Sequence, residues 1–358
     1  ALFIALQIQS NHIQMSYYFM FVILFFVGAY FEDAYKKKEL PHFFKASGVL
    51  ALAAVVGVCI NISNLYHTYE YSKETMRGKS ELKQEGAAAS QTSSGLDRDY
   101  ITNWSYGIGE TLTLLVPNVK GGGSGSTMSQ SEAAMAKANP MYNGIYSQLP
   151  QYFGEQPWTA GPVYVGAFVM FLFVLGCFIV KGPLKWALLG ATIFSILLSW
   201  GKNFMGLTDF FIDYVPMYNK FRAVSSILVI AEFTIPLLAI FALKEILSKP
   251  DMLKQEKNCR GVIAALVLTA GVALILAVAP GTFFSSFITT QEMTALKQAL
   301  PAEHLAPFVA NLTEMREAII ASDAWRSFFI IVIGCLFLFL YQLRKLKASF
   351  TLAGVALL

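Results

Sequence analysis

Residues 200–222 read WGKNFMGLTDFFIDYVPMYNKFR and join two strongly apolar stretches of the chain. In a helix over the middle of this segment, apolar side chains at every third or fourth position form one face, and Asp209 and Asp213 lie together on another. Pro216 should end that helix, because proline disfavours helical conformation in the residue before it. We therefore predict an external amphipathic hairpin over 201–222, which does not itself cross a membrane.

The composition of the chain is that of a membrane protein. Of its 358 residues, 55% are hydrophobic and only 14% are charged, whereas soluble domains carry roughly 25% charged residues. The mean hydropathy is +0.52. The four cysteines show neither CxxC pairing nor the spacing of metal ligands. An ordinary soluble domain is excluded, and we expect neither a protein-bound metal centre nor a nucleic-acid partner.

Apolar stretches close to the about 20 residues that span a bilayer recur along the chain. We predict complete spans at 15–31, 46–65, 161–180, 184–200, 223–241, 261–281 and 325–343, with partial spans at both ends. Because the sequence starts and stops inside apolar stretches, we expect it to be an internal fragment of a longer protein. The predicted fold class is an all-α polytopic transmembrane helical bundle with extended extracytoplasmic loops that contain interfacial helices.

The positions of the basic residues predict the orientation of the bundle. Fourteen of the 27 lysines and arginines lie in four short connections, at 32–45, 181–185, 244–260 and 344–347. The positive-inside rule makes these connections cytoplasmic, so all long polar segments face outward. The predicted division is transmembrane helices at 1–65, a large extracytoplasmic loop at 66–160, transmembrane helices at 161–281 with the hairpin 201–222, extracytoplasmic amphipathic helices at 282–324, and transmembrane helices at 325–358, the last one truncated.

The external loops differ in character along their length. In the 66–160 loop, AAASQTSSG at 87–95 and GGGSGS at 121–126 are typical of flexible breaks. The rest of that loop is rich in aromatic residues and is either part of a site or a connecting cap. In the last external loop, apolar spacing on either side of Pro301 predicts two short amphipathic helices at the membrane interface.

Charged side chains gather at the ends of the 201–222 hairpin. Lys202, Lys220 and Arg222 bring positive charge to the predicted outer boundary, against the inward bias of the other cations. Such a cluster can hold an anionic head group, since arginine binds phosphate through two hydrogen bonds. The cations could equally be interfacial anchors. Asp209 and Asp213 could supply a general base and its orienting partner, or they could cap the hairpin or pair with Lys202 and Lys220.

Three further residues are candidates for a functional role, in a chain without the sequence signature of any soluble enzyme. Glu110, in SYGIGET, is a carboxylate within apolar sequence. His12, in QSNHIQM, belongs either to a substrate pocket or to the cap of a helix turn. Glu232 lies inside the predicted 223–241 span, where a carboxylate is either functional or paired with a neighbouring helix.

Several segments together resemble the YfhO-like bacterial membrane proteins of the Bacteroidetes type. They are NHIQMSYY, KKKELPHFFK, YSKETMRGKSEL, SSGLDRDYITNWSYGIGETLTLLVPN and VPMYNKFRAVSSIL. The resemblance covers the chain from Asn11 to about Lys244. This family is similar to the GT-C glycosyltransferases, which take a sugar from a polyprenyl-phosphate carrier and attach it to an acceptor at the outer face of the membrane.

The resemblance implies a membrane glycosyltransferase that moves a sugar from a polyprenyl-phosphate donor to an envelope glycan acceptor. It implies the bacterial inner membrane, long loops in the periplasm, contact with membrane lipids, and room for a divalent metal ion. GT-C enzymes also keep an essential acidic residue in an external loop that would lie before Ala1 here. The implied roles are the lipid phosphate for Arg222, Lys220 and Lys202, the substrate pocket for His12 and Tyr218, and acid/base catalysis for Asp209, Asp213 and Glu110.

Two other functions fit the sequence as well. A lipid or solute transporter or flippase is suggested by Glu232 and Pro236, which lie within one predicted span. A non-catalytic subunit could scaffold an envelope complex through the external loops and its membrane partners. Polar residues that collect at the outer rim, rather than through the mid-membrane, favour the enzyme over the transporter.

Overall fold

The computed structural model describes residues 1–78, 95–249 and 251–358. Within these ranges the regular structure is helical, with one isolated bridge between Thr127 and Pro150 and no β-strand. Five of the described helices are long and apolar enough to cross a membrane, or six if one bent pair is counted as a span. The predicted all-α polytopic bundle is confirmed, and the chain is a multi-pass membrane protein.

Three of the five spans are single helices: α2 (Ile13–Lys37), α3 (Leu40–Ile60) and α15 (Ala302–Gln342). The span Val224–Ser248 contains α11 (Val229–Ser248), and the span Glu256–Val278 contains α12 (Glu256–Leu266) and α13 (Val272–Val278).

The described chain forms two compact units. The first consists of Ala1–Tyr106 and Lys181–Thr234, and the second of Gly107–Val180 and Ile235–Leu358. The predicted 66–160 loop therefore contributes to both units. Shorter helices in the first unit are α1 (Leu2–Gln9), α4 (Ile62–Lys73), α5 (Arg98–Thr102), α9 (Pro183–Ser199) and α10 (Met205–Tyr214). Those in the second are α6 (Glu132–Met135), α7 (Asn143–Tyr146), α8 (Ala167–Ile179), α14 (Thr290–Ala299) and α16 (Ala348–Ala356).

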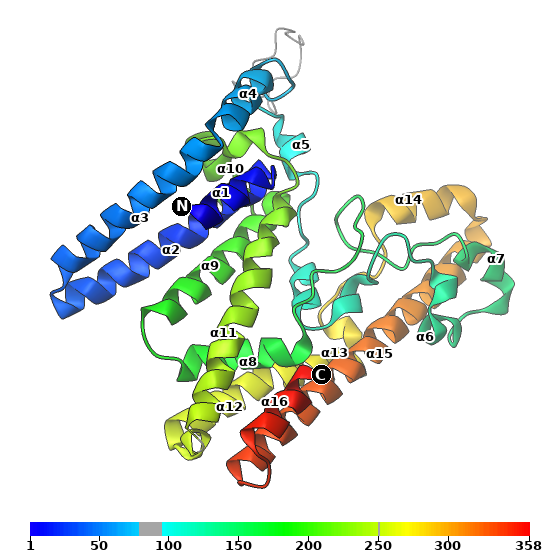
Figure 1. The fold of residues 1–358 in the computed structure, drawn as a ribbon. Helices are drawn as coiled ribbons and strands as arrows, with labels where there is room; N and C mark the ends of the chain where they lie inside the picture. Colours follow the sequence, from blue (N-terminus) through cyan, green and yellow to red (C-terminus); the bar gives the residue numbers. More distant parts are fainter. Residues whose placement is uncertain (79–94, 250) are drawn as a thin grey trace. The chain divides into compact units, whose positions relative to one another are not determined.

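In the first unit, α2 and α3 run side by side and are joined by a basic turn (Figure 1). The Lys37 ammonium pairs with Asp33 at 2.7 Å, one turn earlier, so the helix continues past the predicted end of its span. Lys38 then adopts a left-handed conformation with φ of 61°. Pro41 lies in the first turn of α3, where its missing N–H costs nothing.

The opening segment 200–222 bends back as predicted. The axes of α9 and the following Gly201–Tyr214 segment differ by 107°. Gly201 has a φ of +47°, and a Cβ atom there would lie 2.1 Å from the Ser105 hydroxyl oxygen, so only glycine fits the bend. The apolar face of α10 packs through Phe211 into the core of the first unit, and the helix ends before Pro216.

In the second unit, two predicted boundaries are wrong. Helix α8 has 13 residues, because Gly166, with a φ of +99°, precedes it; the 161–180 stretch is therefore helical over less than a full span. The second predicted amphipathic helix is not separate: α15 runs for 41 residues through Pro307 into the last span. Phe308 and Leu312 are fully buried in the core of this unit, so tertiary packing continues the helix where the sequence suggested a break.

The glycine-rich stretch 121–126, expected to be a flexible break, is a packed turn. Gly121 and Gly122 have φ values of +82° and +79°. A Cβ atom on Gly121 would lie 1.9 Å from the Gln151 carbonyl oxygen, and Ser124 donates a backbone hydrogen bond to Thr159 at 2.9 Å. The glycines of this turn therefore let its backbone lie close to the backbone of residues 151–159. The other expected break, at 87–95, lies outside the described residues except for its last position.

Candidate functional site: an anion-binding groove in the first unit

A groove of about 620 Å³ lies in the first unit at the N-terminal end of α2. Its walls come from three segments far apart in sequence: residues 11–14, helix α4 with the residues after it, and residues 217–221. The polar and charged lining residues include Asn11, His12, Gln14, Tyr69, Arg77 and Lys220. Of the sequence candidates, the groove brings together His12 and Lys220.

Two cations of this groove are held against each other by reciprocal hydrogen bonds. The Lys220 ammonium donates to the Arg77 carbonyl oxygen at 2.6 Å, and Arg77 Nε donates to the Lys220 carbonyl oxygen at 2.9 Å. Partial burial lowers the pKa of Lys220, and burial is the one cause of that shift. In the part of the chain that the structure describes, no carboxylate forms an ion pair with either side chain. The groove therefore carries positive charge that an anion can neutralise.

The start of α2 is hydrogen-bonded to the last residue of the hairpin and to a residue after it. The Gln14 amide donates to the Arg222 carbonyl oxygen at 2.7 Å and to the Ser226 hydroxyl at 3.1 Å. His12 occupies the N-cap position of α2, but its side chain makes no capping hydrogen bond and lines the groove instead. The structure thus favours the pocket interpretation of His12 over the cap.

Arg222 and Lys202, the other two predicted phosphate ligands, do not line the groove. The Arg222 guanidinium donates to the Tyr100 hydroxyl at 2.6 Å and lies over the rings of Tyr100 and Trp104 at 5.6 and 6.0 Å. Lys202 is exposed, and its backbone N–H donates to the Ser105 hydroxyl at 2.9 Å. Arg222 flanks the groove through its backbone, whereas its charge lies on an aromatic surface.

The carboxylates of α10 face a cation that the sequence did not single out. Arg98, the first residue of α5, forms ion pairs with both Asp209 and Asp213, the latter at 2.6 Å. These two carboxylates raise the pKa of Arg98. Both aspartate side chains stay more than 40% exposed. The pairing joins α10 to α5, which lies within the predicted 66–160 loop. Neither aspartate lines the groove.

Tyr218 is a core residue and not a pocket residue, which corrects its predicted role. It is only 2% exposed, and its ring packs 5.4 Å from that of Phe211. Burial raises the pKa of Tyr218 well above its ordinary value. Apolar packing of the hairpin against α2 therefore positions Lys220 two residues further on.

Glu110 lies in the second unit and is almost fully buried, with 2% exposure. Its carboxylate accepts hydrogen bonds from the Tyr152 hydroxyl at 2.5 Å, from the Gly107 N–H at 2.7 Å and from the Glu155 N–H at 3.3 Å. Burial raises the pKa of Glu110, although these donors partly oppose the shift. Glu110 therefore ties together residues 107–110 and 152–155.

A lysine accompanies this buried carboxylate. The Lys120 ammonium lies 4.2 Å from the centre of the Phe284 ring and 4.8 Å from that of Phe153. Burial lowers the pKa of Lys120, and the charge of Glu110 opposes the shift. Glu110 and Lys120 thus form a shielded polar cluster in the second unit, whereas the groove with Arg77 and Lys220 belongs to the first.

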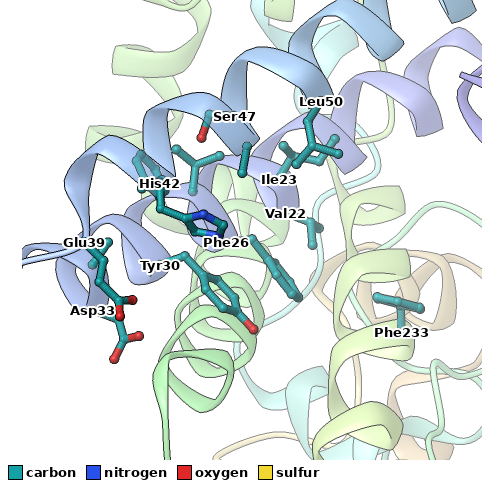
Figure 2. Close-up of a pocket in the computed structure, with 14 residues that line it drawn as sticks. Val22, Ile23, Phe26, Tyr30, Asp33, Glu39, His42, Ser47, Leu50 and Phe233 are labelled. Carbon is teal, nitrogen blue, oxygen red and sulfur yellow. The ribbon is translucent and has the colours of Figure 1, made fainter. Parts of the chain in front are cut away.

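A second cavity of about 620 Å³ in the first unit is mostly apolar (Figure 2). It lies between α2 and α3, with Phe233 of α11 at one end. Asp33, Glu39 and His42 line the cavity toward its other end. Such a cavity suits a hydrocarbon chain rather than a charged substrate.

Comparison with known proteins gives no match to a family model, to a curated protein or to a solved structure. The function must therefore be inferred from the chemistry of the site.

The sequence analysis did not identify Arg77, Gln14 or Arg98 as site residues. Each acts through a residue more than 100 positions away, and no local spacing signals such a contact. Among the described residues, no group of His, Cys, Asp or Glu is arranged to hold a metal ion.

Proposed function

We propose that this protein is a membrane glycosyltransferase that moves a sugar from a polyprenyl-phosphate donor to an envelope acceptor, at the extracytoplasmic face of the bacterial inner membrane. The supporting observation is the groove in which the Arg77 and Lys220 side chains meet with no described carboxylate to neutralise them. A phosphate there would receive charge-assisted hydrogen bonds at the end of a membrane-spanning helix. The resemblance to the GT-C enzymes supplies the reaction.

The same helix offers a path for the prenyl chain. His12 lies at the groove end of α2, and Tyr30, eighteen residues on, lines the apolar cavity. Eighteen residues make five helical turns, so the two positions share one side of the helix about 27 Å apart. A long polyprenyl chain would thus run along α2 from its phosphate into apolar surroundings.

In the proposed reaction, the acceptor oxygen attacks the anomeric carbon and polyprenyl phosphate leaves. Lys220 and Arg77 stabilise the negative charge that develops on that phosphate. His12, which lines the same groove, would take the acceptor proton. Asp209, Asp213 and Glu110 are the acid/base candidates from the sequence, and none of them lines the groove.

A transporter or flippase is the second candidate, and a polar groove and an apolar cavity along the same helix α2 would also serve it. However, α11 remains one helix across Pro236, whereas many transporters bind substrate at an unwound segment. Glu232 is exposed on the surface of α11 rather than directed into a polar path. A scaffolding subunit of an envelope complex is the third candidate, and it would purify with stoichiometric partners.

The enzyme proposal is tested by substituting the groove cation. We expect Lys220→Ala to reduce sugar transfer from a polyprenyl-phosphate sugar at least about tenfold, the equivalent of one charge-assisted hydrogen bond. Lys220→Arg should restore much of the activity. Lys73→Ala is the matched control, because Lys73 is a cation of α4 that pairs with Glu70 and does not line the groove. Transfer by Lys220→Ala at the wild-type rate would remove the proposed role.

A binding measurement separates the enzyme from the alternatives. Polyprenyl phosphate without sugar should bind the wild-type protein in detergent and bind Lys220→Ala more weakly, as measured by native mass spectrometry. If binding follows this pattern but no sugar is transferred, a flippase is favoured. If polyprenyl phosphate does not bind at all, both proposals fail and the scaffolding function is favoured.

A further inference from the structure

A separate, smaller cavity lies in the second unit, where α8, α12 and α15 meet. Its volume is about 270 Å³, and its walls are almost entirely apolar. Phe171 and Leu175 come from α8, Val262 from α12 and Leu338 from α15. The volume is below the about 300–1,000 Å³ of sites for drug-sized ligands. It suits part of a single hydrocarbon chain.

A buried amide at the end of α15 lines this cavity. Gln342 is 6% exposed, and neither its Nε2 nor its Oε1 atom has a hydrogen-bond partner among the described residues. A buried amide without partners is costly, and native proteins rarely leave one unpaired. The neighbouring Tyr341 is satisfied, since its hydroxyl donates to the Leu247 carbonyl oxygen at 2.6 Å. The Gln342 amide therefore calls for an occupant that both accepts and donates a hydrogen bond.

The surroundings of Gln342 are strongly basic. The segments 251–260 and 343–347 hold six basic and two acidic residues. The Asp251 carboxylate already forms ion pairs with two of these cations, the Lys254 ammonium at 2.7 Å and the Arg344 guanidinium at 3.1 Å. Lys254 also lines the cavity. Excess positive charge around an apolar cavity at the ends of membrane-spanning helices favours an anionic lipid.

We propose that this cavity holds one acyl chain of a phosphatidylglycerol-type phospholipid. An ester carbonyl of the lipid accepts a hydrogen bond from Gln342 Nε2, and a hydroxyl of its glycerol head group donates to Oε1. The phosphate lies beside Lys254. The choice of lipid follows from charge, because an ethanolamine head group offers a donor but adds a cation to a region that already has too many. The site is independent of the proposed sugar transfer.

Two cysteines of the cavity wall make occupancy measurable. Cys259 and Cys335 line the cavity, whereas Cys59 lies on α3 in the first unit; Cys59 and Cys259 are exposed, and Cys335 is half-buried. Bound phosphatidylglycerol should slow the alkylation of Cys259 and Cys335 by a maleimide and leave Cys59 unchanged. Cys59, which does not line the cavity, is thus an internal control for reagent and detergent effects.

The test uses the delipidated full chain with phosphatidylglycerol, phosphatidylethanolamine or oleate. We expect phosphatidylglycerol to bind with one-to-one stoichiometry by native mass spectrometry and to raise the melting temperature. Gln342→Leu should fold, since it removes an unsatisfied amide, and should bind phosphatidylglycerol about tenfold more weakly or worse. Gln298→Leu, at an exposed position of α14 in the same unit, is the matched control.

Each other outcome contradicts the proposal. Equal affinity for phosphatidylethanolamine would remove the role of the basic surroundings, and full occupancy by oleate alone would identify a free fatty acid instead. Unchanged binding to Gln342→Leu would show that the amide does not contact the lipid. A second variant, Val262→Trp, fills the cavity, so phosphatidylglycerol that binds this variant normally must lie elsewhere.

Discussion

Three ionisable residues of this protein are buried to an extent that disfavours their charged forms. Glu110 is buried with a raised pKa, and Lys120 nearby has a lowered pKa for the same reason. In the first unit, burial lowers the pKa of Lys220. The two residues differ in the hydrogen bonds that offset the cost of burial. The Glu110 carboxylate accepts from three described donors, whereas the Lys220 ammonium donates to one backbone carbonyl oxygen. Lys220, which has no carboxylate partner among the described residues, is the better candidate for binding a ligand.

The raised pKa of Glu110 predicts a pH-dependent stability. Burial favours the protonated carboxyl, so its contribution to folding is complete below its ordinary pKa of 4.5 and is lost as pH rises through the raised value. Glu110→Gln stays neutral and can donate to the Tyr152 hydroxyl oxygen. The melting temperature of this variant in detergent should therefore rise relative to that of the wild type as the pH increases above about 5.

The ionisable groups around Glu110 also affect the difference in melting temperature between the wild type and Glu110→Gln. Lys120, Glu155 and Tyr152 face the carboxyl and are present in both proteins, but the Glu110 charge raises the pKa values of Lys120 and Tyr152 in the wild type alone. A constant difference in melting temperature across that pH range would mean that Glu110 does not change protonation there. A difference that shrinks as pH rises would mean that its pKa is lowered, contrary to the burial argument.

At the level of elements, close backbone approach shapes the second unit as much as apolar burial does. The 121–126 turn packs against residues 150–161 through glycines with positive φ. Helix α15 continues through Pro307 because Phe308 and Leu312 are buried beyond it. Both features depend on partners distant in the sequence.

Two glycines of the turn allow a matched test. Gly121→Ala should destabilise the protein by about 1–3 kcal/mol through backbone strain, with a further cost because its Cβ would lie 1.9 Å from a carbonyl oxygen. Gly125→Ala, in the same turn, meets nothing within 4 Å and should change stability by roughly 0.5 kcal/mol or less. Thermal melting in detergent compares the two. Equal effects would indicate that the turn is as loose as its composition suggests.

At the scale of the whole molecule, the proposed function requires the groove to face outward. The groove lies at the N-terminal end of α2, and the basic turn after Lys37 lies at the other end of the same spanning helix. The positive-inside rule assigns that turn to the cytoplasm. With that orientation the groove would open to the periplasm, where the proposed polyprenyl-phosphate donor and acceptor would be available.

Cysteine labelling in intact cells tests this orientation. In a variant without the four native cysteines, a membrane-impermeant maleimide should label Ser72→Cys, at the groove, and should not label Lys36→Cys until the cells are opened. Both positions lie at helix ends, and Lys36 is solvent-exposed. Labelling in the opposite pattern would place the groove in the cytoplasm and exclude an envelope acceptor.

The sequence by itself determined the fold class, five of the seven predicted membrane spans, and the end of helix α10 before Pro216. These follow from hydropathy, helical period and proline, which act over a few neighbouring residues. Only the tertiary structure decided the site. It placed Arg77 beside Lys220, paired Arg98 with Asp213, buried Tyr218 and kept α15 continuous. The physical reason is that side-chain charge and burial depend on what packs nearby, and here those neighbours come from distant parts of the chain.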